Sequence, residues 1–184
     1  MTHTPFNPRH LPVEIFASEG AVLELQTELS ALERLCESIQ GSAQGLVVHW
    51  SVQGELRTQR YGAQPQVWLH LHAQAQVPMT CQRCMAEALI PLEIEQSFRF
   101  VANEKQAEAE DEESEEDVLV LSRDFDVQAL VEDELIMALP PIPKHDECPQ
   151  KPRFEAVDQG FSEEVDAKPN PFAVLQQLKS KDRT

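Results

Sequence analysis

The chain has 184 residues and a mass of 20.8 kDa, which fits one medium-sized domain with tails and is long enough to bury a core without cross-links. Its formal net charge is −17, so its surface should repel an RNA or DNA backbone, and basic proteins are the more natural direct partners. With four cysteines and no apolar run of membrane-spanning length, we expect a cytoplasmic protein with reduced thiols and no membrane association.

The first clear pattern, in residues 21–39, predicts a strand followed by a helix. We favour a strand over 21–27 and a helix over 30–39 because Ser30 and Glu33 have the spacing of a capping box, in which each side chain satisfies a free backbone N–H group. Cys36 lies on the apolar stripe of this helix, where a thiol behaves as a small hydrophobic group. We therefore expect it in the core and not in a metal site.

From residue 46 the hydrophobic period changes to two, which is typical of strands. A hairpin is predicted over residues 46–61, with its turn at Gly54. The next strand should bury one set of alternate side chains: Val67, Leu69, Leu71, Ala73, Ala75 and Val77. The same pattern resumes at Leu92, Ile94, Phe98 and Phe100, so Cys81 and Cys84 should lie near the tip of a long hairpin.

His70 and His72 share the other face of that strand, as two metal ligands would. No third ligand is evident nearby in the sequence. We therefore expect two histidines on a partly solvated strand face.

Residues 103–117 contain nine acids and a single lysine, and this composition predicts a disordered acidic insertion. A short strand is expected at 118–122. A helix over 126–138, capped by Asp124 or Asp126, should follow and end at a block of prolines.

Three acids on that predicted helix, Glu132, Asp133 and Glu134, are interpreted as an exposed acidic face, with a partner-contact patch as the alternative. The domain should extend over residues 1–148, followed by an irregular extension over 149–184. In that extension Asn170 and Pro171 predict the start of a terminal helix over 171–180, and Phe172 opens its apolar edge. The three acids, Asn170, Pro171 and Phe172 are the candidate partner-binding residues.

The CxxC pair has three interpretations: a redox pair, a zinc knuckle, or a turn packed by buried thiols. A thioredoxin-type pair begins a helix, whereas here Pro91 and a strand follow soon after, which disfavours redox chemistry. Zinc fits better, because His145 and Cys148 could join Cys81 and Cys84 in a Cys₃His set. Structural zinc and a packed turn both stay open.

Three motifs, CQRCM, LVEDELIMALPPIPKHDEC and KPNPFAVLQQLK, resemble those of the YceD family, known as large ribosomal RNA subunit accumulation proteins. The resemblance implies a role in the synthesis, processing or stability of 23S ribosomal RNA. Genes of this family commonly lie beside the gene for a small basic zinc-ribbon protein of the large subunit, and the resemblance implies the same gene neighbour here.

We therefore predict an α+β fold in which a few helices cover an antiparallel sheet, with curling into a small barrel as an alternative. There is no phosphate-binding loop, nucleophile elbow or HExxH motif, so no enzymatic activity is expected. The resemblance implies a non-enzymatic factor in large-subunit biogenesis. Its acidic surface should bind a basic large-subunit ribosomal protein or a pre-ribosomal particle. The alternatives are direct RNA binding by the sheet, with Trp50, Trp68 or Phe98 as stacking surfaces, and a small zinc-binding adaptor.

Overall fold

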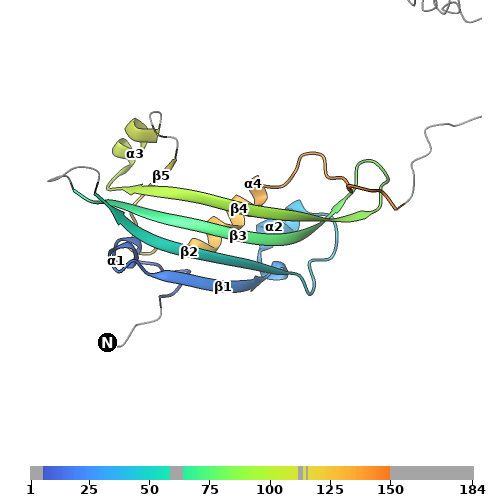
Figure 1. Ribbon diagram of the computed structural model, residues 1–184, viewed down its shortest axis with the longest axis horizontal. Coiled ribbons are helices and arrows are strands. Elements are labelled where there is room, and N and C mark those ends of the chain that lie inside the picture. Colours follow the sequence, from blue (N-terminus) through green and yellow to red (C-terminus); the bar gives the residue numbers. More distant parts are fainter. Residues whose placement is uncertain (1–5, 59–63, 112–113, 115, 150–184) are drawn as a thin grey trace, which may run out of the picture. The chain divides into compact units, whose positions relative to one another are not determined.

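The computed structural model describes residues 6–58, 64–111, 114 and 116–149, all of which belong to one compact unit, Met1–Gln150 (Figure 1). Five strands form one open sheet in the order β1-β2-β3-β4-β5. The strands are β1 (Val22–Glu28), β2 (Val47–Arg57), β3 (Gln66–Thr80), β4 (Glu87–Val101) and β5 (Asp117–Val120). The helices are α1 (Val13–Ser18), α2 (Glu33–Ser38), α3 (Glu104–Asp111) and α4 (Val127–Met137), with a 3-10 turn, η1, at Leu29–Ala31. The α+β prediction is confirmed, with an open sheet and not a closed barrel.

Strands β1 to β4 pair antiparallel, and β3 and β4 form the long hairpin that was predicted. The six β3 residues assigned to the core face are all buried, as are the four on β4. Strand β5 instead pairs parallel to the end of β4. The connection that contains α3 carries the chain back along β4, so β5 runs beside β4 in the same direction.

Strand β2 runs straight through Gly54, so the predicted hairpin turn at this residue was wrong. Gly54 serves a different purpose: a Cβ atom there would lie 2.7 Å from the Cα atom of Ala17. Glycine therefore lets α1, a helix that the sequence patterns did not predict, pack directly on the strand.

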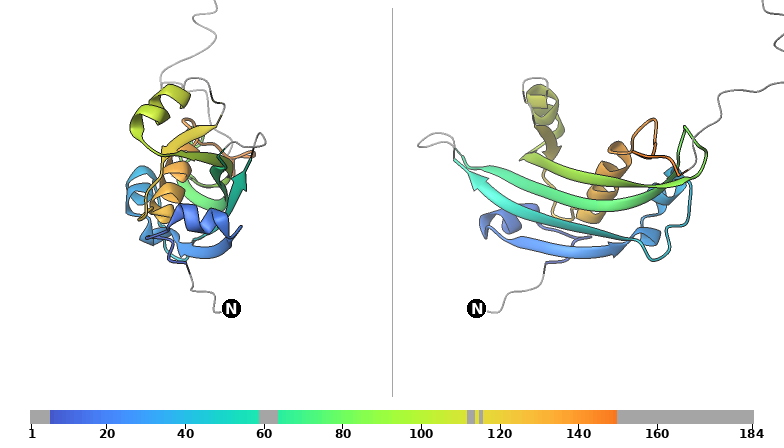
Figure 2. Two further views of the ribbon diagram at one scale, coloured as in Figure 1. Left: turned by 90° about the vertical axis from the view of Figure 1, so that its left-hand side faces the viewer. Right: turned by 45° about the vertical axis from the view of Figure 1, so that its right-hand side comes forward.

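The core lies between one face of the sheet and helices α1, α2 and α4, which contribute Phe16, Leu35 and Leu135 among others. Figure 2 shows the strands curving past these helices, with α3 set apart beside β5. The opposite face of β1 to β4 carries polar side chains. Within the described residues, no helix is both long enough and apolar enough to cross a membrane.

The start of α2 is capped by a residue distant in the sequence, and the predicted Ser30–Glu33 capping box does not form. The N-cap residue is Leu32, and the Ser30 hydroxyl donates to the Glu28 carboxylate instead. The backbone N–H groups of Arg34 and Leu35 donate to Oε1 of Glu132 on α4, at 2.8 and 3.1 Å. A tertiary contact has replaced the local cap.

The acidic insertion contains a helix where disorder was predicted. Helix α3 buries Ala107, and Glu110 on its last turn pairs with the buried Arg99 of β4, which also donates to Ser114 at 2.7 Å. One arginine thus attaches the acidic segment to the sheet. The helix predicted over 171–180 lies outside the described residues.

Candidate functional site

The tip of the β3–β4 hairpin is a tight turn that carries Cys81 and Cys84. The Met85 N–H donates to the Cys81 carbonyl at 2.9 Å, and the Cys81 N–H donates to the Ala86 carbonyl at 2.9 Å. Met85 has a φ of 61°, in the left-handed region that a non-glycine residue seldom adopts. The turn is followed by strand β4 and not by a helix, so the helix-dipole arrangement of a thioredoxin-type pair is absent from this hairpin.

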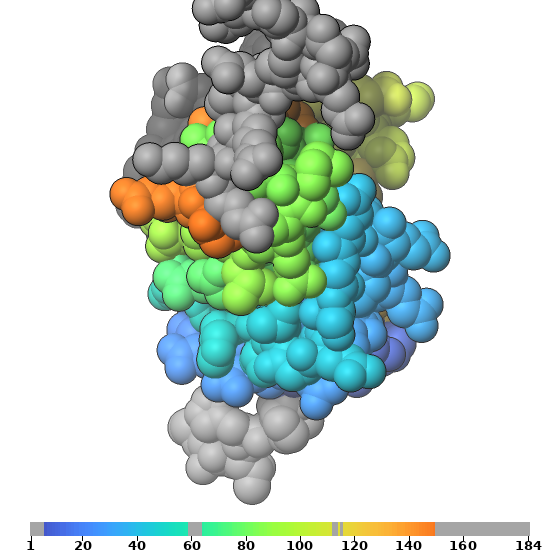
Figure 3. Space-filling model, turned by 90° about the vertical axis from the view of Figure 1, so that its right-hand side faces the viewer, coloured from blue at the N-terminus to red at the C-terminus, as the bar shows by residue number. Residues whose placement is uncertain are grey.

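The segment after α4 lies beside this tip (Figure 3). It brings His145 and Cys148 close to the two cysteines. The Gln82 N–H donates to the Pro143 carbonyl at 2.9 Å, which fixes the approach of the segment. Arg83 donates through Nε to the Cys148 sulfur at 3.0 Å, and through NH2 to the carbonyls of His145 at 2.9 Å and Asp146 at 3.2 Å.

One atom from each of Cys81, Cys84, His145 and Cys148 lies within 4.8 Å of all the others, although 61 residues separate Cys84 from His145. The Cys81 and Cys148 sulfurs are 3.8 Å apart, and the Cys84 sulfur is 3.5 Å from Nδ1 of His145. Four ligands at typical zinc–sulfur and zinc–nitrogen bond lengths sit about 3.3–3.8 Å apart around a tetrahedral ion. The Cys81–Cys148 and Cys84–His145 distances fall in this range, and the four donors fit zinc in number and type.

The hydrogen bonds around the cluster also suit a metal. Nε2 of His145 lies 2.9 Å from the Glu87 carbonyl, which favours a proton on Nε2 and leaves Nδ1 free to act as the ligand. Burial alone would raise the pKa of the Cys81 thiol, but backbone N–H groups of His145, Arg83 and Cys84 and the neighbouring Cys84 side chain outweigh it and lower the pKa to about 5. A thiolate at Cys81 is the form that binds a metal.

Cys36, expected in the core and not in a metal site, is half-buried on α2. Its sulfur lies 3.2 Å from the Leu29 carbonyl, and burial raises the pKa of its thiol. The other residues around the cluster carry no sequence signal that could have revealed their roles, because Glu87 acts through a backbone carbonyl and Arg83 contacts residues more than 60 positions away.

The region that builds this cluster is also the region shared with known proteins. A family model described as Large ribosomal RNA subunit accumulation protein YceD matches residues 69–179, which is more than half of the chain and includes all four cluster residues. The chain belongs to the YceD family. A curated relative from Haemophilus influenzae, named Large ribosomal RNA subunit accumulation protein YceD, is 40% identical over 113 residues, covering 59% of this chain and 63% of that protein. The chain thus matches just under two thirds of the length of this relative, and no solved structure matches it.

Elsewhere in this YceD-family chain, His70 is held in a network, and no group of potential metal ligands among the described residues includes it with His72. Its Nδ1 lies 2.8 Å from the Ser97 hydroxyl and its Nε2 lies 2.8 Å from the Glu55 carboxylate, so both ring nitrogens have partners. A serine, a histidine and a carboxylate in contact also resemble a hydrolytic triad. Ser97 lies inside β4, however, where it pairs with His70 of β3 and the backbone N–H groups lie in the plane of the sheet.

The three acids on α4 differ in their surroundings. Glu132 is buried and accepts hydrogen bonds from the Arg34 guanidinium as well as from the α2 backbone, and Asp133 also pairs with Arg34. Glu134 has no basic partner within the described residues; burial, with repulsion from Asp117 and Asp133, raises the pKa of its carboxyl. Of the other predicted partner-binding residues, Asn170, Pro171 and Phe172 lie outside the described residues.

The aromatic side chains considered as RNA-stacking surfaces are all buried. Trp50 and Phe98 face the core, at 3% and 2% exposure, and Trp68 lies under the Arg57 guanidinium at 4% exposure. Arg57 and Arg99 both lie near Trp68, but each is paired with a glutamate, and Arg83 is in the cysteine cluster. The described surface therefore offers neither exposed rings nor a basic patch at these positions.

Proposed function

We propose that this chain acts in the cytoplasm as a non-enzymatic factor required for the synthesis, processing or stability of 23S ribosomal RNA. In this proposal it binds a basic component of the large subunit, a ribosomal protein or a pre-ribosomal particle. The family membership carries the proposal: the matched region covers residues 69–179, and the Haemophilus influenzae relative is named for large ribosomal RNA subunit accumulation. The net charge of −17 supports a basic protein and not bare RNA as the direct partner.

The cysteine cluster has a structural part in this proposal. When bound by Cys81, Cys84, Cys148 and His145, a zinc ion would supply a cross-link between the hairpin tip and the segment after α4. All four protein positions would then be filled, which is typical of structural and not catalytic zinc. Arg83 would hold the second segment in place and offset negative charge on the sulfurs.

Deletion and complementation test the proposed role. Cells that lack the gene should contain less mature 23S than 16S ribosomal RNA, and expression of the full chain should restore the ratio. Unchanged 23S levels in the deletion strain would contradict the proposal. The Phe172→Ala variant belongs in the same assay: if the terminal motif contacts a partner, this change should reduce complementation more than it reduces the melting temperature.

Direct RNA binding by the sheet is the other candidate, and the structure gives it little support because Trp50, Trp68 and Phe98 are buried. A small zinc-binding adaptor is compatible with the main proposal, since an adaptor also works by binding proteins. The metal content of the purified chain distinguishes a zinc-binding adaptor from a protein in which the cysteine thiols pack together without a metal.

A further inference from the structure

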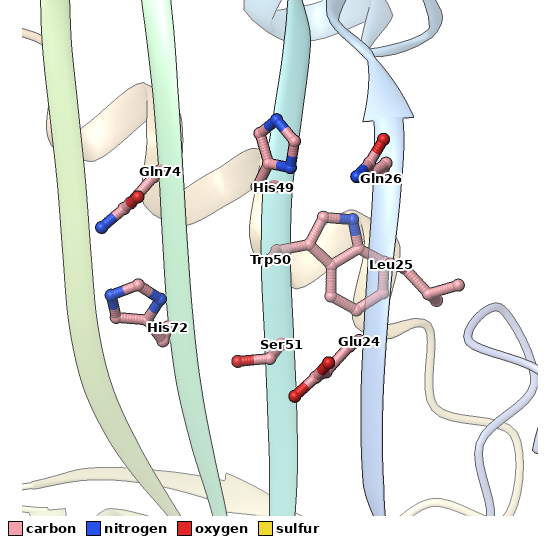
Figure 4. Close-up of a pocket in the computed structure, with 8 residues that line it drawn as sticks. All are labelled: Glu24, Leu25, Gln26, His49, Trp50, Ser51, His72 and Gln74. Carbon is pink, nitrogen blue, oxygen red and sulfur yellow. The ribbon is translucent and has the colours of Figure 1, made fainter.

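The face of the sheet that points away from α1, α2 and α4, here called the open face, is formed by alternate residues of β1 to β4. Strand pairing aligns Glu24, Ser51, His72 and Glu95 in one row across the strands, and Gln26, His49, Gln74 and Glu93 in the next row. All of these residues are exposed except the half-buried Ser51. Figure 4 shows the β1 to β3 members of the two rows lying side by side.

Two adjoining grooves lie on the open face. One has a volume of about 520 Å³ and includes Glu24, Gln26 and His72 in its lining. The other has a volume of about 480 Å³ and extends toward Pro91 and Glu93. The two grooves share His49 and Gln74, so together they form one shallow depression across the strands.

The depression is acidic and rich in hydrogen-bonding groups. Its glutamates are Glu24 and Glu93, with Glu95 beside them in the first row, and no Lys or Arg lines either groove. Within the described residues, none of these three carboxylates forms an ion pair with Lys or Arg; the charged contact here is a 3.8 Å approach of His72 to Glu93. The arginines of this face, Arg57 and Arg99, lie further along the strands and are paired with Glu55 and Glu110.

We propose that the open face is the docking surface for an extended, Lys- and Arg-rich polypeptide segment. This inference rests on the proposed binding of a basic large-subunit component and assigns that binding to one surface. Carboxylates would pair with the basic side chains, and the glutamine, serine and histidine side chains would accept or donate hydrogen bonds. A nucleic acid is the wrong occupant, because its phosphates would meet uncompensated carboxylates.

A pair of charge-matched variants tests the surface. The face variant, Glu24→Gln/Glu93→Gln/Glu95→Gln, removes three negative charges from the open face. The control variant, Glu14→Gln/Glu19→Gln/Glu37→Gln, removes three from exposed positions on or next to α1 and α2. The overall charge changes equally, so any difference between the variants reports where the charge lies. Melting curves establish that both variants fold.

The probe is a synthetic peptide of about ten residues that alternates Arg and Ser, matched to the two-residue period of an extended chain. Its dissociation constant is measured by calorimetry at low salt. We expect the face variant to bind at least about tenfold more weakly than the wild type, and the control variant within about twofold of it. Equal weakening in both variants, or no binding by the wild-type chain, would overturn the assignment.

The proposed function and the docking surface can fail separately. If the face variant loses the peptide but fully restores 23S ribosomal RNA in deleted cells, the surface exists and the proposed use of a basic partner is wrong. If both variants weaken peptide binding equally while the wild-type chain still retains basic ribosomal proteins, the proposed function stands and the docking surface is overturned.

Discussion

At the scale of single residues, the four cysteines divide into three that gather with His145 and one that does not. We expect the untagged wild-type chain to contain about one zinc ion, and Cys81→Ser to lose it. Because metal-binding free energy appears as folding free energy, this variant should also melt at least about 5 °C lower. Cys36→Ser is the matched control and should keep the metal. Elemental analysis measures the zinc content and thermal melts measure the loss of stability. A wild-type chain that is fully folded without metal would contradict the zinc assignment.

Arg83 should control how firmly the metal is held. It contacts the Cys148 sulfur and two carbonyls of the same segment, so Arg83→Ala should leave zinc bound but speed its transfer to a chelator by roughly tenfold. Arg83→Lys should restore only part of the slow release, since an ammonium group cannot make the forked contacts. Arg123→Ala, at an exposed arginine, is the control. A release rate unchanged by Arg83→Ala would show that the contact has no role in the site.

Glu134 should make stability depend on pH in a particular direction. Burial and two nearby acids raise the pKa of its carboxyl in the folded chain, so its contribution to stability is complete at low pH and falls as pH rises through that pKa. Glu134→Gln should therefore stabilise the chain at neutral pH, by up to about 0.5 kcal/mol after solvent screening. The gain should disappear as pH falls toward about 4. Melts of both proteins across this range test the sign, and a gain that grows with acidity would contradict it.

At the scale of secondary-structure elements, α2 depends on α4. Glu132→Ala would remove the carboxylate that accepts from two N–H groups at the start of α2 and from Arg34, and we expect a loss of roughly 2–3 kcal/mol of unfolding free energy. Asp133→Ala removes only an exposed contact with Arg34 and should cost less than about 1 kcal/mol. Chemical denaturation measures both losses. Equal losses would mean that the cap contributes nothing beyond a surface ion pair.

The same elements show why part of the fold could be predicted and part could not. The faces of β3 and β4 follow from a two-residue period, and α4 follows from its stripe and from Asp126, whose side chain accepts from the Ala129 N–H. The cap of α2 by Glu132 and the attachment of α3 by Arg99 depend on residues distant in the sequence. Local patterns therefore predicted a capping box before α2 and disorder over the residues that form α3, because neither tertiary contact has a local signal.

The candidate site divides in the same way. Cysteine spacing and residue type identified the four possible ligands. Their mutual distances, the Glu87 carbonyl behind His145 and the contacts of Arg83 arise only when the hairpin tip meets the segment after α4. Backbone carbonyls have no residue-type signal, so no sequence pattern could have shown them.

At the scale of the whole molecule, the proposed direct partner of this strongly negative chain is a basic protein. A screened attraction of this kind weakens as salt rises, with an interaction range of about 10 Å at 0.1 M ionic strength. Acidic residues on the open face and on α3 would each contribute to the encounter with a basic partner. Binding through RNA would instead require clustered basic groups, whereas Arg34, Arg57 and Arg99 are each paired with an acid.

Purification of the full chain from cells at low salt, with and without nuclease, distinguishes a protein partner from an RNA partner when both the bound proteins and the bound RNA are identified. We expect basic large-subunit ribosomal proteins to be retained after nuclease treatment and to be released between about 50 and 300 mM salt. If the bound material is ribosomal RNA, and every ribosomal protein is lost once the RNA is digested, the chain binds RNA directly and the proposed binding of a basic protein is wrong.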